Sequence, residues 1–409
     1  MNHHLIYKKI VRRVNLECIF LLCLVFLLLR PVLKRFWRKP IWLISEKENE
    51  ARDNGYEFFK YVQSVNTGRD VFYVITRDSY DLEKVQGCNF VFYRSLKHFL
   101  LFSVSECLIA SQMHTGIPYS YVDRTVWLKK LSSKLKIVFL QHGVTKDSYK
   151  LFTRARTQID LFICAGKPEY DYLRLHAGYC AGNGALALTG FPRFDSYVFN
   201  RQDGIRSIFV FPTFRKWLVS ADQQSGYETS FSFEQSKFFK FYDNFLKNPM
   251  LTEFLETTGT QCNFYLHYAM QSYSKKFKVD SKQVKIIDPK STDIRDLILY
   301  SDLLITDRSS LAFDFAYMLK PVIYVDFDSK EFEQYHYKPG YFDYRKDGFG
   351  PVHQDPKCVV NAILELAINN GRMTAPYISR AKDFFPIQDH NNSERVYDAI
   401  IKFLKDCDT

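Results

Sequence analysis

The chain has 409 residues, which is long enough for two domains with separate cores. Its composition, with 46% hydrophobic and 25% charged residues, indicates a globular protein rather than a disordered scaffold. A formal net charge of +11 favours an anionic partner such as a membrane surface or a phosphate-rich substrate, and without a nucleic-acid-binding motif we expect no nucleic-acid partner. Nine cysteines without CxxC spacing argue against a zinc ribbon or a disulfide framework.

Residues 1–39 differ from the rest of the chain. An apolar run from Leu16 to Leu29, interrupted by Glu17, lies between basic residues on both sides. The run is shorter than the roughly 18–20 residues of a spanning helix, and the basic flanks suit anionic lipid head groups on the cytoplasmic face. We predict a membrane anchor, either a short span or an interfacial helix. The alternative is an apolar helix docked on the body.

A first series of short apolar runs alternates with helix-length segments from residue 40 to residue 200. Continuous apolar character predicts parallel strands that are buried on both faces. The predicted strands are 41–44, 71–75, 108–110, 137–140, 161–164 and 185–188. A connection from Gly190 to about Gly204 then separates this doubly wound domain from a second one.

The second series spans residues 201–378, with predicted strands at 208–211, 264–266, 284–287, 303–305 and 322–325. Residues 379–409 are predicted to be helical and to pack back across the first domain. The fold class is therefore α/β, with two Rossmann-type domains. Because ligands in such sheets bind beyond the carboxyl ends of the strands, we expect the site in the central cleft between the domains.

The segment from Gln141 to Asp147 directly follows a predicted strand. Gly143 allows a sharp turn and leaves His142 uncrowded, so this histidine can act as a general base near neutral pH. The alternative is a solvent-exposed loop histidine. Lys146 is a candidate contact on the acceptor side, where it would attract a phosphorylated substrate.

Polar residues also follow strands of the second domain. His267 ends the 264–266 run and can face His142 across the cleft. Thr213 and Arg215 follow the 208–211 run and offer a hydroxyl and a guanidinium to phosphate.

The segment 303–316 predicts a strand, a polar turn and a helix that begins at two serines. Thr306, Asp307, Ser309 and Ser310 form a predicted donor-diphosphate site, and Asp314, one helical turn later, is predicted to bind a ribose hydroxyl. The alternative for the serines is a simple helix cap. Residues 326–328 match an Asp-x-Asp metal motif but lie beyond this helix, so we assign no metal ligand or cofactor; metal dependence stays open.

The order and spacing of these motifs resemble those of the CDP-glycerol glycerophosphotransferases, which build teichoic acids and capsular polymers. The resemblance spans residues 41–351 and rests on segments 141–147, 167–170, 190–195, 212–215 and 306–316. It implies a GT-B-like fold, with His142 as the base that activates the acceptor hydroxyl and His267 holding the donor diphosphate. Three residues depart from the family pattern: Gln141 replaces Trp, Tyr268 replaces Pro and Arg308 replaces Tyr.

The resemblance implies transfer of glycerol phosphate, or a similar polyol phosphate, from a CDP-activated donor to a hydroxyl of a lipid-linked or polymeric acceptor, releasing CMP. The expected location is the cytoplasmic face of a bacterial cell membrane. One alternative is a GT-B glycosyltransferase that uses a nucleotide sugar. Another is a catalytically silent membrane-bound scaffold for polymer assembly.

Overall fold

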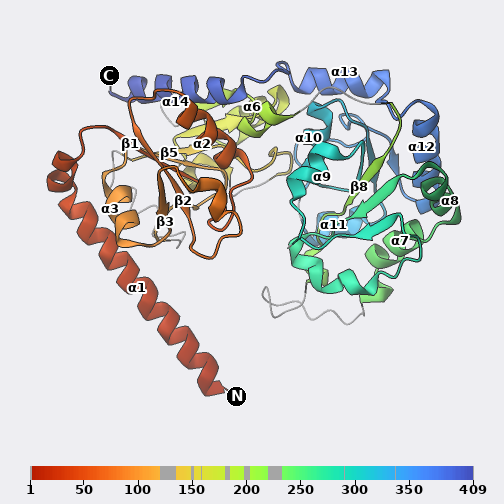
Figure 1. The fold of residues 1–409 in the computed structure, drawn as a ribbon, viewed down its shortest axis with the longest axis horizontal. Helices are drawn as coiled ribbons and strands as arrows, with labels where there is room; N and C mark the ends of the chain where they lie inside the picture. The colour runs from red at the N-terminus through yellow and green to blue at the C-terminus, as the bar shows by residue number, and fades with distance from the viewer. Residues whose placement is uncertain are drawn as a thin grey trace.

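The chain folds into two α/β domains, each built on a parallel sheet (Figure 1). The computed structural model describes residues 2–119, 135–148, 152–157, 159–179, 185–197, 203–219, 233–289, 291–336 and 338–408. Part of the predicted interdomain connection, residues 198–202, lies outside the described residues. The prediction of two parallel sheets is confirmed.

The first domain contains a seven-stranded sheet in the order β3-β2-β1-β4-β5-β6-β7. Its strands are β1 (Ile41–Ser45), β2 (Asp70–Ile75), β3 (Phe90–Phe92), β4 (Cys107–Ala110), β5 (Lys136–Phe139), β6 (Leu161–Cys164) and β7 (Ala185–Leu188). Its helices include α2 (Asn54–Ser64), α3 (Leu96–Val104), α5 (Arg154–Thr157), α6 (Lys167–His176) and the 3-10 turn η4 (Pro192–Ser196). The central strands β1 and β4 are buried along their whole length, which explains their continuous apolar sequence.

The second domain repeats this topology in a six-stranded sheet of order β10-β9-β8-β11-β12-β13. Its strands are β8 (Ser207–Phe211), β9 (Gln261–Phe264), β10 (Val284–Ile286), β11 (Leu303–Thr306), β12 (Val322–Val325) and β13 (Val352–His353). Its helices are α7 (Lys237–Leu246), α8 (Pro249–Thr258), α9 (Ile294–Tyr300), α10 (Leu311–Tyr317), α11 (Ser329–Tyr335) and α12 (Pro356–Ile368), with the 3-10 helix η7 (Tyr268–Lys276). In both sheets the strand order reverses between the first and fourth strands, so the carboxyl ends of these strands open a crevice.

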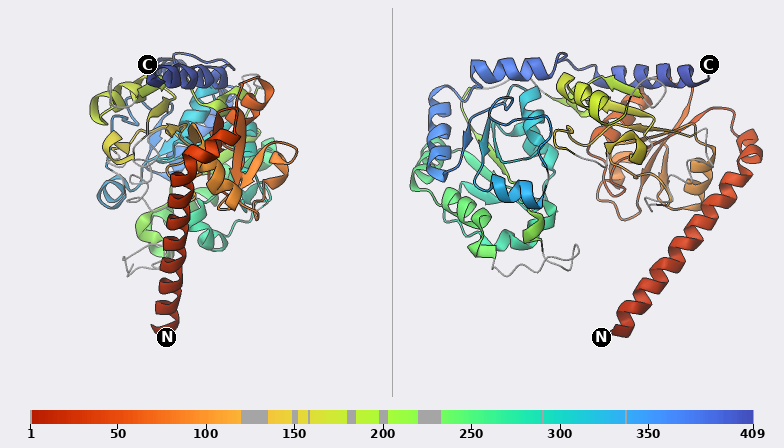
Figure 2. Two further views of the ribbon diagram at one scale, coloured as in Figure 1. Left: turned by 90° about the vertical axis from the view of Figure 1, so that its left-hand side faces the viewer. Right: turned by 180° about the vertical axis from the view of Figure 1, so that it is seen from behind.

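Two closing helices join the domains along one side of the molecule (Figures 1 and 2). Helix α13 (Ala375–Phe384) packs against α10 and α6, and α14 (Asn392–Asp408) returns to contact α2, β6 and β7 of the first domain. Aromatic rings continue this contact inside the protein, where Phe194 stacks on Tyr317 with ring centroids 4.1 Å apart. The buried core therefore runs from one domain into the other.

The N-terminal helix α1 (Asn2–Leu33) extends away from both sheets (Figures 1 and 2). Cys23 and Leu27 on one face are buried beside Phe99 of α3. Within the part of the chain that the structure describes, no helix combines the length and the apolar character needed to cross a membrane. The predicted spanning segment is therefore not supported.

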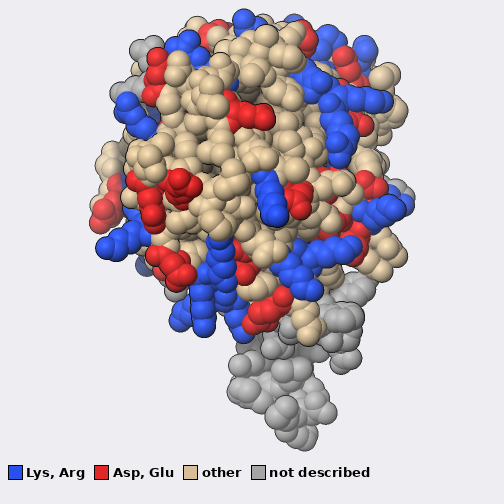
Figure 3. All heavy atoms as spheres, turned by 90° about the vertical axis from the view of Figure 1, so that its right-hand side faces the viewer, with Lys and Arg blue, Asp and Glu red and all other residues tan. Residues whose placement is uncertain are grey.

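The outer face of the second domain carries charges of both signs. Figure 3 shows Lys and Arg side chains interspersed with Asp and Glu on this face. Within this domain, ion pairs at 2.6 Å join Lys237 to Glu331 and Lys276 to Glu234. The net positive charge is thus not gathered into one basic patch on this face.

Candidate active site

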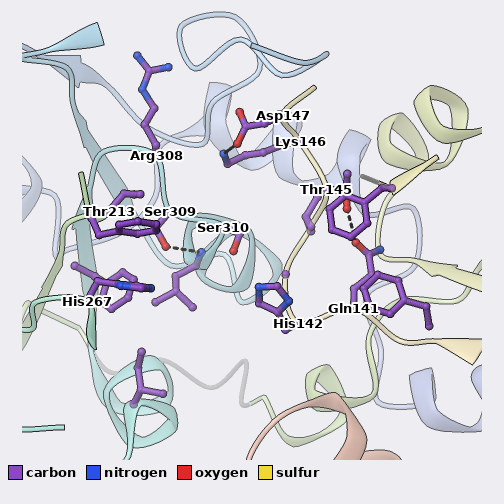
Figure 4. A pocket seen from close by; sticks show the side chains of 18 residues that line it. Gln141, His142, Thr145, Lys146, Asp147, Thr213, His267, Arg308, Ser309 and Ser310 are labelled. Atoms are coloured by element: carbon purple, nitrogen blue, oxygen red, sulfur yellow. Dashed lines mark hydrogen bonds and ion pairs between the residues drawn. The ribbon is translucent and has the colours of Figure 1, made fainter. Parts of the chain in front are cut away.

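A pocket of about 360 Å³ lies between the two domains and is lined by residues of both. The first domain contributes the segment that follows β5, including His142, Gly143 and Lys146. The second domain contributes the ends of β8, β9 and β11, including Thr213, His267, Arg308, Ser309 and Ser310. In Figure 4 the two histidines lie on opposite sides of the space in front of Ser309 and Ser310. The structure therefore brings most of the predicted site residues together.

The His142 side chain is exposed and lines the pocket. Partial loss of hydration beside the neighbouring protein lowers the pKa of His142, and the carboxylate of Asp53 partly opposes the shift by favouring the imidazolium. The ring is consequently neutral at neutral pH and retains a basic nitrogen. It can accept a proton from a hydroxyl that is bound beside it.

His267 lies at the start of η7 with a defined hydrogen-bonding state. Its Nδ1 accepts a hydrogen bond from the Ala269 backbone N–H at 3.3 Å, so in the neutral ring Nε2 carries the proton. Burial, together with the positive charge of Lys47 and the neighbouring His142, lowers the pKa of His267 to about 4. Phe214 stacks on the ring at 4.7 Å. His267 is therefore suited to donate one hydrogen bond rather than a positive charge.

The turn between β11 and α10 places two serines on the pocket wall. Ser309 Oγ accepts a hydrogen bond from the Leu311 backbone N–H at 3.2 Å, so it satisfies one N–H group of the first turn of α10, whereas the side chain of the N-cap residue Ser310 forms no capping hydrogen bond. Ser310 lies against the first domain, because a Cβ added to Gly143 would be 2.4 Å from Ser310 Oγ and 3.1 Å from Ser310 Cβ. Gly143 thus lets the turn from Gln141 to Thr145 approach closely to the turn between β11 and α10, which we call the serine turn.

Arg215 does not reach the pocket, which corrects its predicted role as a phosphate ligand. Its side chain is completely buried, and its guanidinium binds Asp328 through two hydrogen bonds of 2.7 and 2.9 Å and Asp307 at 2.7 Å. Asp307 in turn accepts the Thr213 backbone N–H at 2.8 Å. Thr306, also fully buried, donates its hydroxyl to the Phe211 carbonyl at 2.6 Å. These residues hold the strand ends together behind the pocket wall.

Both aspartates of the Asp-x-Asp motif form ion pairs with arginines. Asp328 pairs with Arg215, and Asp326 pairs with Arg308 at 3.0 Å. Among the described residues, no group of three or more His, Cys, Asp or Glu side chains is arranged to hold a metal ion.

Asp314 also lies away from the pocket, which corrects its predicted contact with a ribose. It is fully buried and accepts hydrogen bonds from Arg193 at 2.7 and 3.0 Å and from the Tyr197 hydroxyl. Arg193 further binds Asp53 at 2.9 Å and the His142 carbonyl at 3.0 Å. Arg193 therefore joins α10 of the second domain to the turn from Gln141 to Thr145 of the first. This role was not predicted from the sequence, although the segment 190–195 contains the residue.

Lys146 lines the pocket with its ammonium 2.5 Å from Asp147. Burial disfavours the charged form, but Tyr344 and Asp147 outweigh it and raise the pKa of Lys146. The side chain is therefore cationic but partly neutralised. Because Asp147 already neutralises part of its charge, Lys146 can contact a substrate but is not expected to bind an anion strongly.

The model of the family described as CDP-Glycerol:Poly(glycerophosphate) glycerophosphotransferase matches residues 27–402. The minor teichoic acid biosynthesis protein GgaB of Bacillus subtilis (strain 168) is 31% identical over 371 residues, which cover 90% of this chain and 40% of that protein. A teichoic acid poly(glycerol phosphate) polymerase of the same organism is 29% identical over 110 residues, or 27% of this chain and 15% of the polymerase. The chain thus spans at most about two fifths of these relatives.

Solved structures show the same fold. The wall teichoic acid polymerase TagF superimposes with a TM-score of 0.67 at 15% identity, covering 100% of both chains. The S. aureus MnaA–UDP co-structure superimposes with a TM-score of 0.53 at 14% identity, covering 90% of this chain and 97% of the other. On the extent of the family match, the chain belongs to the CDP-glycerol:poly(glycerophosphate) glycerophosphotransferase family.

Proposed function

We propose that the chain transfers glycerol phosphate, or a similar polyol phosphate, from a CDP-activated donor to a hydroxyl of a lipid-linked or polymeric acceptor. The observation that carries the proposal is the placement of His142 and His267 on opposite sides of one interdomain pocket. The family match and the relatives in teichoic acid biosynthesis support the reaction class. A TagF structure soaked with CDPG shares the fold and supports a cytidine nucleotide as donor.

In the proposed reaction, His142 accepts the proton of the acceptor hydroxyl. The resulting oxygen attacks the phosphorus that carries the polyol, forming a phosphodiester as the phosphoanhydride bond breaks and CMP leaves with the bonding electrons. His267 donates its Nε2–H, and Ser309, Ser310 and Thr213 offer hydroxyls, to the negative charge that spreads over the diphosphate. Lys146 contacts the acceptor. The buried residues that keep the strand ends and α10 in place lie outside the pocket; they are Arg215, Asp307, Thr306 and Asp314.

The direct test incubates the purified full chain with CDP-glycerol or CDP-ribitol and candidate glycerol-phosphate acceptors, and follows CMP release. Transfer from either donor with a phosphodiester product supports the proposal, and the ratio of rates assigns the polyol. A glycosidic product from a nucleotide sugar would instead indicate a glycosyltransferase. Absence of any cytidine nucleotide binding in calorimetry would favour the silent scaffold.

The contact between Gly143 and Ser310 gives a specific prediction. Gly143→Ala adds a Cβ that the Ser310 hydroxyl must rotate away from, and we expect turnover to fall about tenfold because this hydroxyl then leaves its position in the pocket. The measurement is CMP release in a cycle with Ser310→Ala. Because the clash is with Ser310 Oγ, adding Gly143→Ala to Ser310→Ala should reduce turnover less than adding it to the wild type. Equal effects in both backgrounds would contradict this account.

We further propose that α1 binds the membrane surface at the cytoplasmic face of the bacterial membrane as an interfacial helix. Its exposed apolar side chains are Leu21, Val25, Leu28, Leu29 and Val32. The exposed basic residues Lys34, Arg35, Arg38 and Lys39 follow directly. An apolar face flanked by cations is typical of helices that lie in the interface of anionic bilayers.

This proposal predicts co-sedimentation of the full chain with phosphatidylglycerol vesicles. The double variant Val25→Asp/Leu28→Asp should weaken vesicle binding about tenfold or more, because each buried aliphatic side chain contributes about 1.5–3 kcal/mol. Ile368→Asp on α12 is the matched control, since Ile368 is also exposed but lies in the other domain. Equal binding of the double variant and the control would overturn the proposal.

A further inference from the structure

The residue before His142 has an unusual backbone conformation. Gln141 is 1% exposed and adopts a φ of +62°, in the left-handed region that side chains other than glycine rarely occupy. Such strain persists only where surrounding contacts enforce it, and it is concentrated at functional sites. The strained residue here sets the direction in which the chain presents His142 to the pocket.

Four hydrogen bonds hold Gln141 in this conformation. Its side-chain amide nitrogen donates to the Ile163 carbonyl at 2.7 Å and to Glu169 Oε1 at 3.1 Å. Its amide oxygen accepts from the Thr145 hydroxyl at 2.7 Å, and its backbone carbonyl accepts from Asn54 Nδ2 at 2.8 Å. Figure 4 shows Gln141 and Thr145 joined on the side of His142 that faces away from His267. The amide is therefore fully used within the protein.

Glu169 is the centre of this network. It is fully buried in the first turn of α6, and its Oε1 also accepts the Thr145 backbone N–H at 2.6 Å. Its Oε2 accepts the Ala165 backbone N–H at 2.7 Å, just beyond β6. One carboxylate thus joins the end of a neighbouring strand to both ends of the turn from Gln141 to Thr145, within which His142 lies.

We propose that Gln141 and Glu169 are positioning residues that hold His142 in the orientation required for removing the acceptor proton. This inference rests on the proposed function. Neither side chain needs to touch the substrate, because both act on His142 through the turn.

The network has a charge state that depends on pH. Burial raises the pKa of Glu169 to about 7, although the Ala165 and Thr145 backbone donors and the Gln141 amide act in the opposite direction. Cys164 and Tyr341 also face this carboxylate. Below this pKa a proton occupies an oxygen that otherwise accepts N–H groups. We therefore expect the turn to loosen and turnover to fall as the pH drops through about 7.

The raised pKa of Glu169 makes its contribution to folding stability change with pH in the direction opposite to turnover. Because the native pKa lies above the ordinary value of 4.5, the folded chain binds the Glu169 proton more tightly than the unfolded chain does. The contribution of this group to the free energy of unfolding therefore decreases as the pH rises from 4.5 to about 7. Turnover rising while this contribution falls is a pattern that a purely stabilising role would not produce.

The experiment compares Gln141→Gly and Glu169→Gln with the wild type in the full chain. Gln141→Gly keeps access to the left-handed backbone but removes the side-chain hydrogen bonds, and Glu169→Gln removes one acceptor at nearly constant volume. We expect kcat to fall about tenfold or more in both, with KM for CDP-glycerol changed less than about twofold. Gln63→Ala and Glu83→Gln, both at exposed positions, are the matched controls and should behave as the wild type.

The pH profile of kcat provides the second readout. In the wild type both Glu169 and His142 must lose a proton, so the acid limb should be steeper than a single ionisation. In Glu169→Gln the acid limb of the kcat profile should follow the ionisation of His142 only. The charged and titratable groups that face His142 are Asp53, Arg193 and His267. Wild-type kcat in Gln141→Gly, or an unchanged limb in Glu169→Gln, would overturn the inference. A wild-type chain that releases no CMP would instead overturn the proposed function.

Discussion

Replacing His142 with alanine is expected to abolish transfer, with CMP release reduced about 10²- to 10⁴-fold or more, because proton removal from the acceptor hydroxyl loses its base. Binding of CDP-glycerol should change little, since the donor contacts are assigned to Thr213, His267 and the serine turn on the other wall. Calorimetry of CDP-glycerol binding and a CMP-release assay measure the two quantities separately.

The control for this variant is His176→Ala, because His176 is exposed at the end of α6 and lies outside the pocket. It should retain full turnover. The pH profile adds a second check. Since loss of hydration lowers the pKa of His142, the ring stays an unprotonated base at neutral pH, and its own protonation should reduce activity only as the pH falls through that lowered value, below the loss that we attribute to Glu169. Substantial transfer by His142→Ala would contradict the assignment of the base.

The second large effect concerns stability rather than substrate binding. Arg215→Met leaves the buried carboxylates of Asp307 and Asp328 without their cation, and we expect the free energy of unfolding to fall by about 3–5 kcal/mol. Equilibrium urea denaturation measures this change. A phosphate ligand would behave differently, because its loss would raise KM for the donor and leave stability nearly intact.

Arg345→Met is the matched control for Arg215→Met. Arg345 is 60% exposed and lies 3.8 Å from Asp326, so its removal should cost less than about 1 kcal/mol. If Arg215→Met were as stable as this control and only its KM for CDP-glycerol rose, Arg215 would be a donor ligand after all.

Much of the fold could be predicted from the sequence because buried parallel strands leave continuous apolar runs. The apolar pattern missed two strands, β3 and β13, which lie at sheet edges and have only three and two residues. It also placed one strand of the second domain at 264–266, whereas β9 runs from Gln261 to Phe264 and shares only Phe264 with that prediction. Short edge strands bury little surface and carry a weak signal. The α1 helix was predicted from the same apolar signal. An apolar run does not reveal which of its side chains pack against another helix, as Cys23 and Leu27 do beside Phe99 of α3.

The candidate site could be predicted in part, because strand ends of parallel sheets converge on one edge. His142, His267, Ser309 and Ser310 reach the pocket by this rule. The rule fails for charged residues with distant partners. Arg215 pairs with Asp328, which lies 113 residues later, and Asp314 pairs with Arg193, which lies 121 residues earlier. Local sequence cannot distinguish such a buried ion pair from a free ligand of phosphate.

The most direct test of the central claim is analysis of the acceptor by phosphorus NMR and mass spectrometry after incubation with CDP-glycerol, for the wild type and His142→Ala in parallel. The account predicts an acceptor extended by one or more glycerol phosphates through phosphodiester bonds, with one CMP released for each unit added, and no extension by the variant. A glycosidic linkage, or the same phosphodiester product from His142→Ala, would contradict it.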